Sequence, residues 1–112
     1  MGRRSRQREK APASTYSGEG GTLVLRGSLT PATRREYAAL VAGGSTREDT
    51  WHRAVEFLFE RLAVSWTLEG VEWSKQKELL TRFRVASPGE KAWVRDVLRE
   101  HVAEWFPDVE AP

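Results

Sequence analysis

The segment between Ser87 and Pro107 constrains the fold more than any other part of the sequence. It opens with Ser87-Pro88-Gly89-Glu90, which combines an N-cap serine, a proline at the first helical position and a glutamate placed to bond back to the cap. Apolar residues then recur at helical spacing, and Pro107 prevents the helix from continuing beyond Phe106. The pattern predicts a long amphipathic helix. Its buried face is expected to contain Val94, Val97, Leu98, His101, Val102 and Trp105.

Three further helices are predicted from their start and stop signals. Thr30-Pro31 is an N-cap followed by a proline at the first helical position, and Gly43-Gly44 ends that helix. A second helix begins near Ser45 or Thr46, and we expect it to be the central packing element. Its apolar stripe consists of Trp51, Ala54, Val55, Leu58 and Leu62, with Phe57 and Phe59 on its flanks. Ser74 is expected to cap the third helix, which includes Phe83.

Two short segments have the composition of β-strands. Residues 22–26 follow a glycine-rich turn, and residues 64–68 alternate apolar and hydroxyl side chains before a turn at Glu69-Gly70. A lone strand leaves its backbone groups unpaired, so 64–68 is the best internal partner for 22–26. Pairing of 22–26 with another copy of the chain stays open. The sequence therefore predicts a mainly α-helical fold, a compact bundle of about four helices with a short two-stranded β element.

The charge of the chain divides it into a tail and a body. Residues 1–15 lack hydrophobic periodicity and are expected to form a disordered basic tail, residues 16–108 a single helical domain, and residues 109–112 a C-terminal tail. The net charge is +2, yet residues 1–10 alone carry five basic residues against Glu9. The remaining residues carry 13 basic and 15 acidic side chains, so the basic character belongs to the tail.

Composition excludes several classes of site. The chain has no cysteine, which rules out disulfides, thiolate metal sites and a cysteine nucleophile. No apolar run approaches the roughly 18 residues of a membrane span, and no apolar run follows the N-terminal arginines as a secretory signal requires. We therefore expect a cytoplasmic protein with no membrane association and no cofactor.

The histidines offer the only metal-like spacing in the sequence. His52 and Glu56 are four residues apart on one predicted helix, and His101 and Glu104 are three apart on another. Helical metal bundles use such pairs, but they need further inward carboxylates that this sequence does not supply. No glycine-flanked serine nucleophile and no phosphate-binding loop accompany the histidines. The sequence thus predicts no metal site, no catalytic residues and no enzymatic activity.

Two tryptophans and a basic patch are the candidate contacts for a partner protein. At 100° per residue, Trp93 lies about 140° from Leu98 on its helix, on a largely polar side. A tryptophan there is either an interface anchor or is covered by a second element of the chain. Trp73 has the same ambiguity. Four basic residues of the third helical region are expected to guide a partner electrostatically: Lys75, Lys77, Arg82 and Arg84.

Nucleic-acid binding is the alternative function. The basic residues of the tail are Arg3, Arg4, Arg6, Arg8 and Lys10. Such a cluster attracts phosphate in a salt-dependent way. A site for single-stranded nucleic acid would favour aromatic residues between the basic ones, but residues 1–15 contain no aromatic residue. The basic patch of the third helical region is a second candidate for the same contact.

The order of segments resembles the small tail assembly chaperones encoded by phages and prophages of high-GC bacteria. The resemblance is carried by residues 23–30, which lead from a strand into a helix, and by residues 62–70, which end the amphipathic helix. It covers roughly residues 22–106 in layout, while residues 104–107 depart from it. The resemblance implies a helical, non-enzymatic fold that binds a tape-measure-like protein. From it we expect a protein-binding adaptor or assembly chaperone.

Overall fold

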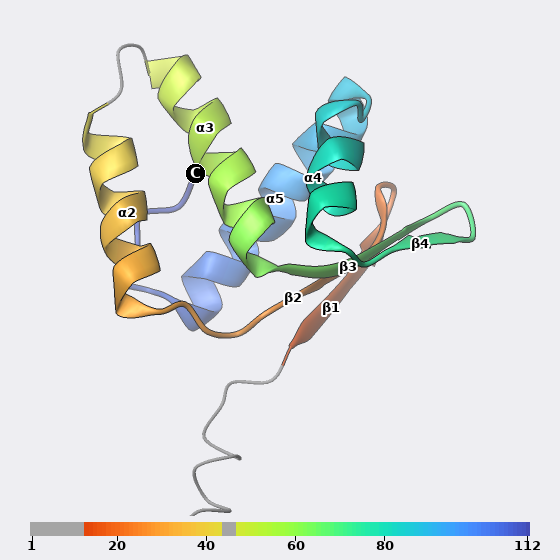
Figure 1. The fold of residues 1–112 in the computed structure, drawn as a ribbon, viewed down its shortest axis with the longest axis horizontal. Coiled ribbons are helices and arrows are strands. Elements are labelled where there is room, and N and C mark those ends of the chain that lie inside the picture. Colours follow the sequence, from red (N-terminus) through yellow and green to blue (C-terminus); the bar gives the residue numbers. More distant parts are fainter. Residues whose placement is uncertain (1–12, 44–46) are drawn as a thin grey trace, which may run out of the picture.

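The computed structural model describes residues 13–43 and 47–112, and over that part of the chain helices and strands alternate in groups (Figure 1). A hairpin comes first, two helices follow, a second hairpin comes next and two helices close the chain. In order, the elements are β1 (Ser14–Gly18), β2 (Gly21–Leu25), α2 (Pro31–Ala42), α3 (Arg47–Leu62), β3 (Ala63–Leu68), β4 (Val71–Trp73), α4 (Gln76–Arg84) and α5 (Pro88–Trp105).

The strands form one four-stranded antiparallel sheet in the order β1-β2-β3-β4. The prediction of a mainly α-helical bundle with a two-stranded β element is therefore wrong, and the described part of the chain has an α+β fold. The expected pairing of residues 22–26 with 64–68 is confirmed, because β2 and β3 are the central neighbours. A register shift between Val24 and Leu25 interrupts that pairing at one point.

Of the two strands that the sequence prediction missed, β1 and β4, β1 is the longer. Its residues Ser-Thr-Tyr-Ser-Gly include only one large apolar side chain, so no alternation announces a strand. Its position is set instead by the tight turn to β2, which pairs Gly18 with Gly21, and by contacts with the last helix. Tertiary contacts, rather than local propensity, therefore make this segment a strand.

One row of side chains crosses all four strands and faces the helices. Tyr16, Leu23, Trp66 and Trp73 are aligned in register from β1 to β4. Leu23 and Trp66 are fully buried, as central strands that pack against helices require. Above them, Phe59 of α3 stacks on Phe83 of α4 with ring centroids 4.9 Å apart. This row and the stacked rings form the centre of the core.

Strand β1 runs along α5 through three successive contacts. Trp105 donates a hydrogen bond from Nε1 to Ser14 Oγ at 3.2 Å. Two residues on, the Tyr16 hydroxyl lies 2.8 Å from His101 Nδ1. Two residues further, Gly18 lies against the Trp93 ring. Alternate residues of the strand thus meet α5 at three points between Trp105 and Trp93, which joins the first described element to the last.

Glycines in the β1–β2 turn make room for two tryptophans. A Cβ atom on Gly18 or Gly20 would collide with the Trp93 indole, and Trp66 Nε1 donates to the Gly20 carbonyl oxygen at 2.7 Å. Gly21 has a φ of +95°, and a Cβ atom there would collide with the Thr67 carbonyl oxygen. Such a backbone conformation is favourable only for glycine. The predicted turn therefore exists, with a packing role that its composition did not reveal.

The predicted helix starts differ in outcome. Thr30 accepts a hydrogen bond from Thr33 N, and Ser87 and Glu90 form a reciprocal capping box, so both predicted caps are confirmed. The predicted cap at Ser74 is wrong, because α4 begins after Lys75 with no side-chain cap. The expected start of α3 at residues 45–46 lies outside the described residues.

Both ends of the described chain are packed. β1 begins at Ser14, inside the range expected to be a tail. At the other end, in the range expected to be a C-terminal tail, the Tyr37 hydroxyl donates to the Glu110 carbonyl oxygen at 2.6 Å and Pro112 is buried. Among the described helices, none is both long and apolar enough to cross a lipid bilayer.

Candidate functional site

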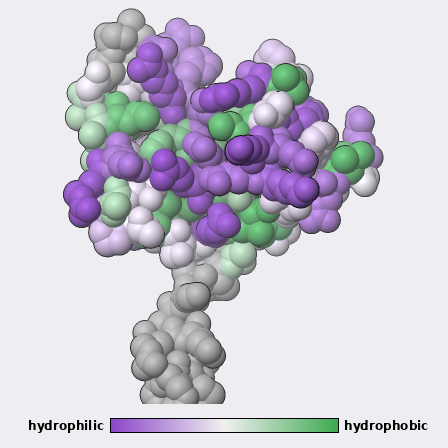
Figure 2. Space-filling model, in the orientation of Figure 1, coloured by the Kyte–Doolittle hydropathy of each residue, from purple (hydrophilic) through white to green (hydrophobic). Residues whose placement is uncertain are grey.

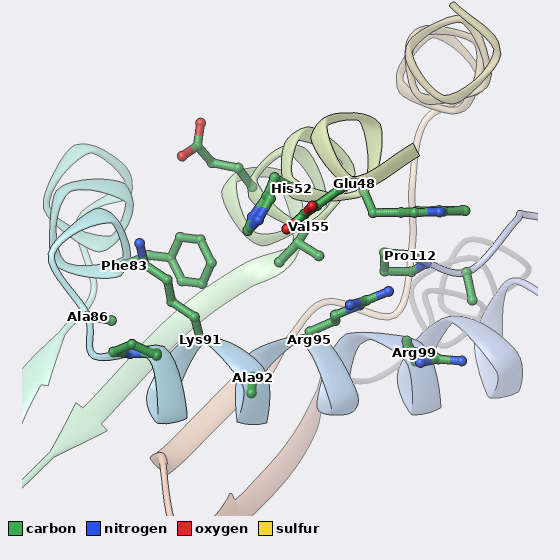
Figure 3. Close-up of a pocket in the computed structure, with 14 residues that line it drawn as sticks. Glu48, His52, Val55, Phe83, Ala86, Lys91, Ala92, Arg95, Arg99 and Pro112 are labelled. Atoms are coloured by element: carbon green, nitrogen blue, oxygen red, sulfur yellow. The ribbon is translucent and has the colours of Figure 1, made fainter. Parts of the chain in front are cut away.

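A groove of about 1080 Å³ lies between α3 and α5 (Figure 3). The view shows α3 on one side, carrying Glu48, His52 and Val55, and α5 on the other. Phe83 lies at one end of the groove and Pro112 at the other. The groove is thus bounded by three helices and by the C-terminal segment.

The floor of the groove is apolar. Val55 of α3, Phe83 of α4 and Ala86, which follows α4, line it and are at most 9% exposed. Trp51 adds a half-buried indole on the α3 side. On the α5 side, Ala92 contributes only a methyl group, so its side chain takes up little of the groove. These apolar side chains form a concave surface that is open to the groove. Contact with an apolar group of a ligand is more favourable for such a surface than contact with water.

Three basic residues form one wall of the groove, and we call them the cationic row: Lys91, Arg95 and Arg99. They follow one another at intervals of four residues on α5, so they share a helix face and span about 12 Å along it. In Figure 3 the side chains of Lys91 and Arg95 extend from α5 toward α3. The Lys91 ammonium also lies 5.8 Å from the centre of the Phe83 ring.

The opposite wall carries Glu48, His52 and Glu56 at the same spacing on α3. No ion pair joins the two walls among the described side chains. Glu56 is paired instead with Arg84 of α4, whose guanidinium donates two hydrogen bonds of 3.0 and 2.9 Å. This contact lowers the pKa of the Glu56 carboxyl, so Glu56 stays ionised and its charge is locally balanced.

The arrangement suits binding through charge and apolar contact. The two arginines of the cationic row can form paired hydrogen bonds with carboxylates. Of the described residues that line the groove, none carries a hydroxyl or thiol group, while one histidine and two carboxylates are present. The groove can therefore bind an anionic group at the cationic row and an apolar group on the floor beside it.

Trp93 packs inside the molecule rather than standing free on α5. Its indole lies against Gly18 and Gly20 of the β1–β2 turn and is half-buried. The element that covers it is therefore the β1–β2 hairpin, rather than the 64–68 strand or the Trp73 segment that the sequence suggested. The ring is partly accessible, so its predicted role as a contact residue stays a prediction.

Trp73 lies on the edge strand β4, directly opposite Trp66 of β3. It is half-buried and packs against the core. Val71, two residues earlier on the same strand, is 53% exposed and adds apolar surface at this edge. Trp73 and Trp93 are not part of the groove lining.

The basic patch predicted around the third helix is divided by the fold. Arg82 pairs with Glu90 of α5 at 3.3 Å and its guanidinium lies 5.6 Å from the centre of the Trp66 ring. Arg84 pairs with Glu56, whereas Lys75 and Lys77 are exposed. Half of the patch therefore stabilises the packing of α4, because acidic partners come from other helices.

The two histidines lie in different environments. His52 is exposed in the groove, whereas His101 is fully buried between β1 and α5. Nε2 of His101 donates to the Arg26 carbonyl oxygen at 2.6 Å, which leaves Nδ1 to accept from Tyr16. Over residues 13–43 and 47–112, no three histidine, aspartate or glutamate side chains gather as metal ligands.

The nucleic-acid alternative uses the basic tail, which lies outside the described residues, and the basic patch of the third helical region, which is described above. Arg3, Arg4, Arg6, Arg8 and Lys10 all precede residue 13, so their placement does not bear on the prediction. The groove shows which basic residues sequence reasoning missed. Lys91, Arg95 and Arg99 recur every four residues on the helix with the clearest boundaries, and this spacing was a readable signal for a charged face.

The visible surface is mostly polar. Figure 2 shows hydrophilic side chains over most of this face, with hydrophobic residues in separate small patches. A broad exposed apolar patch would mark an interaction surface by itself. This face has none of that kind, so the argument for a binding site comes from the groove.

No protein family, no curated protein and no solved structure matches this chain. The resemblance to tail assembly chaperones therefore stays a prediction. The helical fold that it implied differs from the four-stranded sheet described above.

Proposed function

We propose that the chain is a non-enzymatic, cytoplasmic adaptor or assembly chaperone that holds a segment of another protein in the groove between α3 and α5. The observation that carries the proposal is the pairing of an apolar floor with the cationic row. The resemblance in segment order adds a specific candidate, a tape-measure-like protein of a phage tail.

The charges around the groove support a binding role. Five arginines elsewhere on the described chain form ion pairs with carboxylates, among them Arg34 with Asp108, Arg61 with Glu36 and Arg82 with Glu90, whereas Arg26 and Arg35 do not. Arg95 and Arg99 form no ion pair with a described residue, although they lie in a hollow where a bound segment would be partly shielded from water. Shielding strengthens charge contacts relative to those on an open surface.

Site-specific cross-linking tests the proposal. Ala92 lines the groove and is exposed, so a photoreactive benzoylphenylalanine placed there will contact whatever occupies the groove. Ala38 is an equally exposed alanine on α2, outside the groove lining, and is the matched control. In the cells that express the protein, we expect one defined adduct from position 92, identified by mass spectrometry, and none from position 38.

The proposal fails if both positions give the same adducts or if position 92 gives none. A protein of tail assembly in the adduct supports the phage-tail version, and a different protein removes that version while retaining the adaptor role. An adduct with nucleic acid at position 92 contradicts protein binding and supports the alternative function.

A further inference from the structure

The cationic row and the floor together restrict what the groove can bind. Lys91, Arg95 and Arg99 present three positive charges along about 12 Å of α5. The floor beside them is closed at one end by Phe83 and contains no charged side chain of its own. A ligand that fits both parts has acidic groups along one edge and apolar groups beneath.

Backbone hydrogen bonding distinguishes a helix from an extended peptide in this groove. Its walls are the side chains of α3 and α5, and they offer no strand edge to pair with a peptide backbone. An extended segment pressed on the apolar floor would leave its N–H and C=O groups unpaired, which costs free energy. A helix satisfies those groups internally and presents only side chains.

The spacing of the cationic row also matches a helix. Carboxylates four residues apart on a helix recur at the same axial distance, about 6 Å, as the basic residues of α5. A helix lying along α5 can therefore place successive carboxylates against Lys91, Arg95 and Arg99. Such grooves between helices commonly take an amphipathic helix through apolar residues at the same three- and four-residue spacing.

Resting on the proposed function, we infer that the segment held in the groove is an acidic amphipathic helix, with carboxylates against the cationic row and apolar side chains on the Val55 and Phe83 floor. The α3 wall sets its orientation. Glu48 repels acidic groups, whereas the charge of Glu56 is balanced by Arg84, so the acidic edge of the bound helix faces α5 and the edge beside Glu48 is neutral or basic.

Synthetic peptides test this inference on the full chain. The probe is a peptide of about four helical turns with glutamate at every fourth position beside a leucine stripe, labelled for fluorescence anisotropy. We expect saturable binding that weakens as salt rises, because exposed charge contacts are screened. The double variant R95E/R99E is expected to weaken binding at least tenfold, since it reverses two charges of the row.

Charge exchange provides the decisive control. A peptide with lysine in place of glutamate is expected to show no binding to the wild-type chain and measurable binding to R95E/R99E. The variant R35E/R53E reverses two exposed arginines that do not line the groove, and it should bind the acidic peptide as the wild type does. Circular dichroism confirms that both variants remain folded.

Three results would overturn the inference: equal binding by R95E/R99E, equal binding of a proline-interrupted acidic peptide that cannot form a helix, or displacement of the peptide by a single-stranded oligonucleotide that binds tighter. Failure here is separate from failure of the proposed function. A partner protein cross-linked at position 92 together with no affinity for the acidic helix would retain the adaptor role and reject its acidic helical ligand.

Discussion

At the scale of single residues, His101 is the buried polar group on which the junction of β1 and α5 depends. It is fully buried, and both ring nitrogens are engaged, one by Tyr16 and one by the Arg26 carbonyl oxygen. Burial lowers the pKa of His101, with smaller opposing effects from the Arg26 carbonyl and from Glu104. The folded protein therefore holds the imidazole neutral.

This predicts a loss of stability on mild acidification. In the unfolded chain His101 titrates near 6.5, whereas in the folded protein it takes up a proton only at lower pH. Between those two values the unfolded state binds more protons, so the free energy of unfolding falls as pH drops below about 6.5. Urea unfolding at pH 7.5 and 5.5 measures the effect.

Matched variants isolate the histidine responsible. H101Q should flatten the dependence of unfolding free energy on pH over this range, while H52Q, which changes the exposed histidine of the groove, should retain it. An NMR titration of His101 with a midpoint at or above 6.5 would contradict the prediction, whatever the stability of the variants.

Gly20 makes a second prediction at this scale. A Cβ atom there would collide with the Trp93 ring, which is too rigid to move aside without disturbing α5. We expect G20A to lower the free energy of unfolding by about 1–3 kcal/mol, the usual cost of overpacking. Thermal or urea unfolding measures the loss.

The control for Gly20 is a glycine that has room. A Cβ atom on Gly89, in the first turn of α5, would come no nearer than 4.0 Å to the Ser87 hydroxyl oxygen. G89A should therefore be neutral or stabilise by up to about 1 kcal/mol, because alanine favours helix. A G20A protein as stable as G89A would show that Trp93 does not pack on the turn.

At the scale of elements, mutation can distinguish a serine that caps a helix through a hydrogen bond from a serine that was only predicted to do so. Ser87 accepts from Glu90 N at 3.1 Å, whereas Ser74 is exposed and caps nothing. S87A should cost about 1 kcal/mol of unfolding free energy. S74A should change it by less than about 0.5 kcal/mol. Equal losses from both substitutions would contradict the assignment of α4 to a start after Lys75.

Elements with strong local signals were predictable, and those built by tertiary contact were not. Thr30-Pro31 and the Ser87 box define helix starts in a few residues, and β3 alternates as a half-buried strand should. β1 has no such pattern, because glycine, serine and one tyrosine acquire a strand conformation only through β2 and α5. The wrong fold class follows from two missing strands: β1, which has no alternating pattern, and β4, which has only three residues.

The candidate site was less predictable than the fold. Trp93 could be identified from its place on a polar face of its helix. The β1–β2 hairpin that covers it could not be predicted from the helix pattern. Sequence reasoning also grouped Arg82 and Arg84 as a free patch, because their partners Glu90 and Glu56 lie on other helices. A groove between two helices depends on how those helices cross, which no local pattern encodes.

At the scale of the whole molecule, the first and last described elements, β1 and α5, are joined through contacts of very long sequence separation. Ser14 and Trp105 are 91 residues apart, and Tyr16 and His101 are 85 apart. Contacts of this range close large loops and slow folding, whereas the two hairpins and the helices form from nearby residues.

The contact of β1 with α5 sets an order of events during synthesis. A ribosome makes β1 first, yet the side chains that cover Ser14, Tyr16 and Gly18 belong to residues 93–105. Until residue 105 has been translated, the α5 side chains that contact β1 are incomplete. Tyr16, at the end of the side-chain row across the sheet, then lacks its full cover. The native contacts of β1 with α5 can therefore form only after residue 105 has been translated.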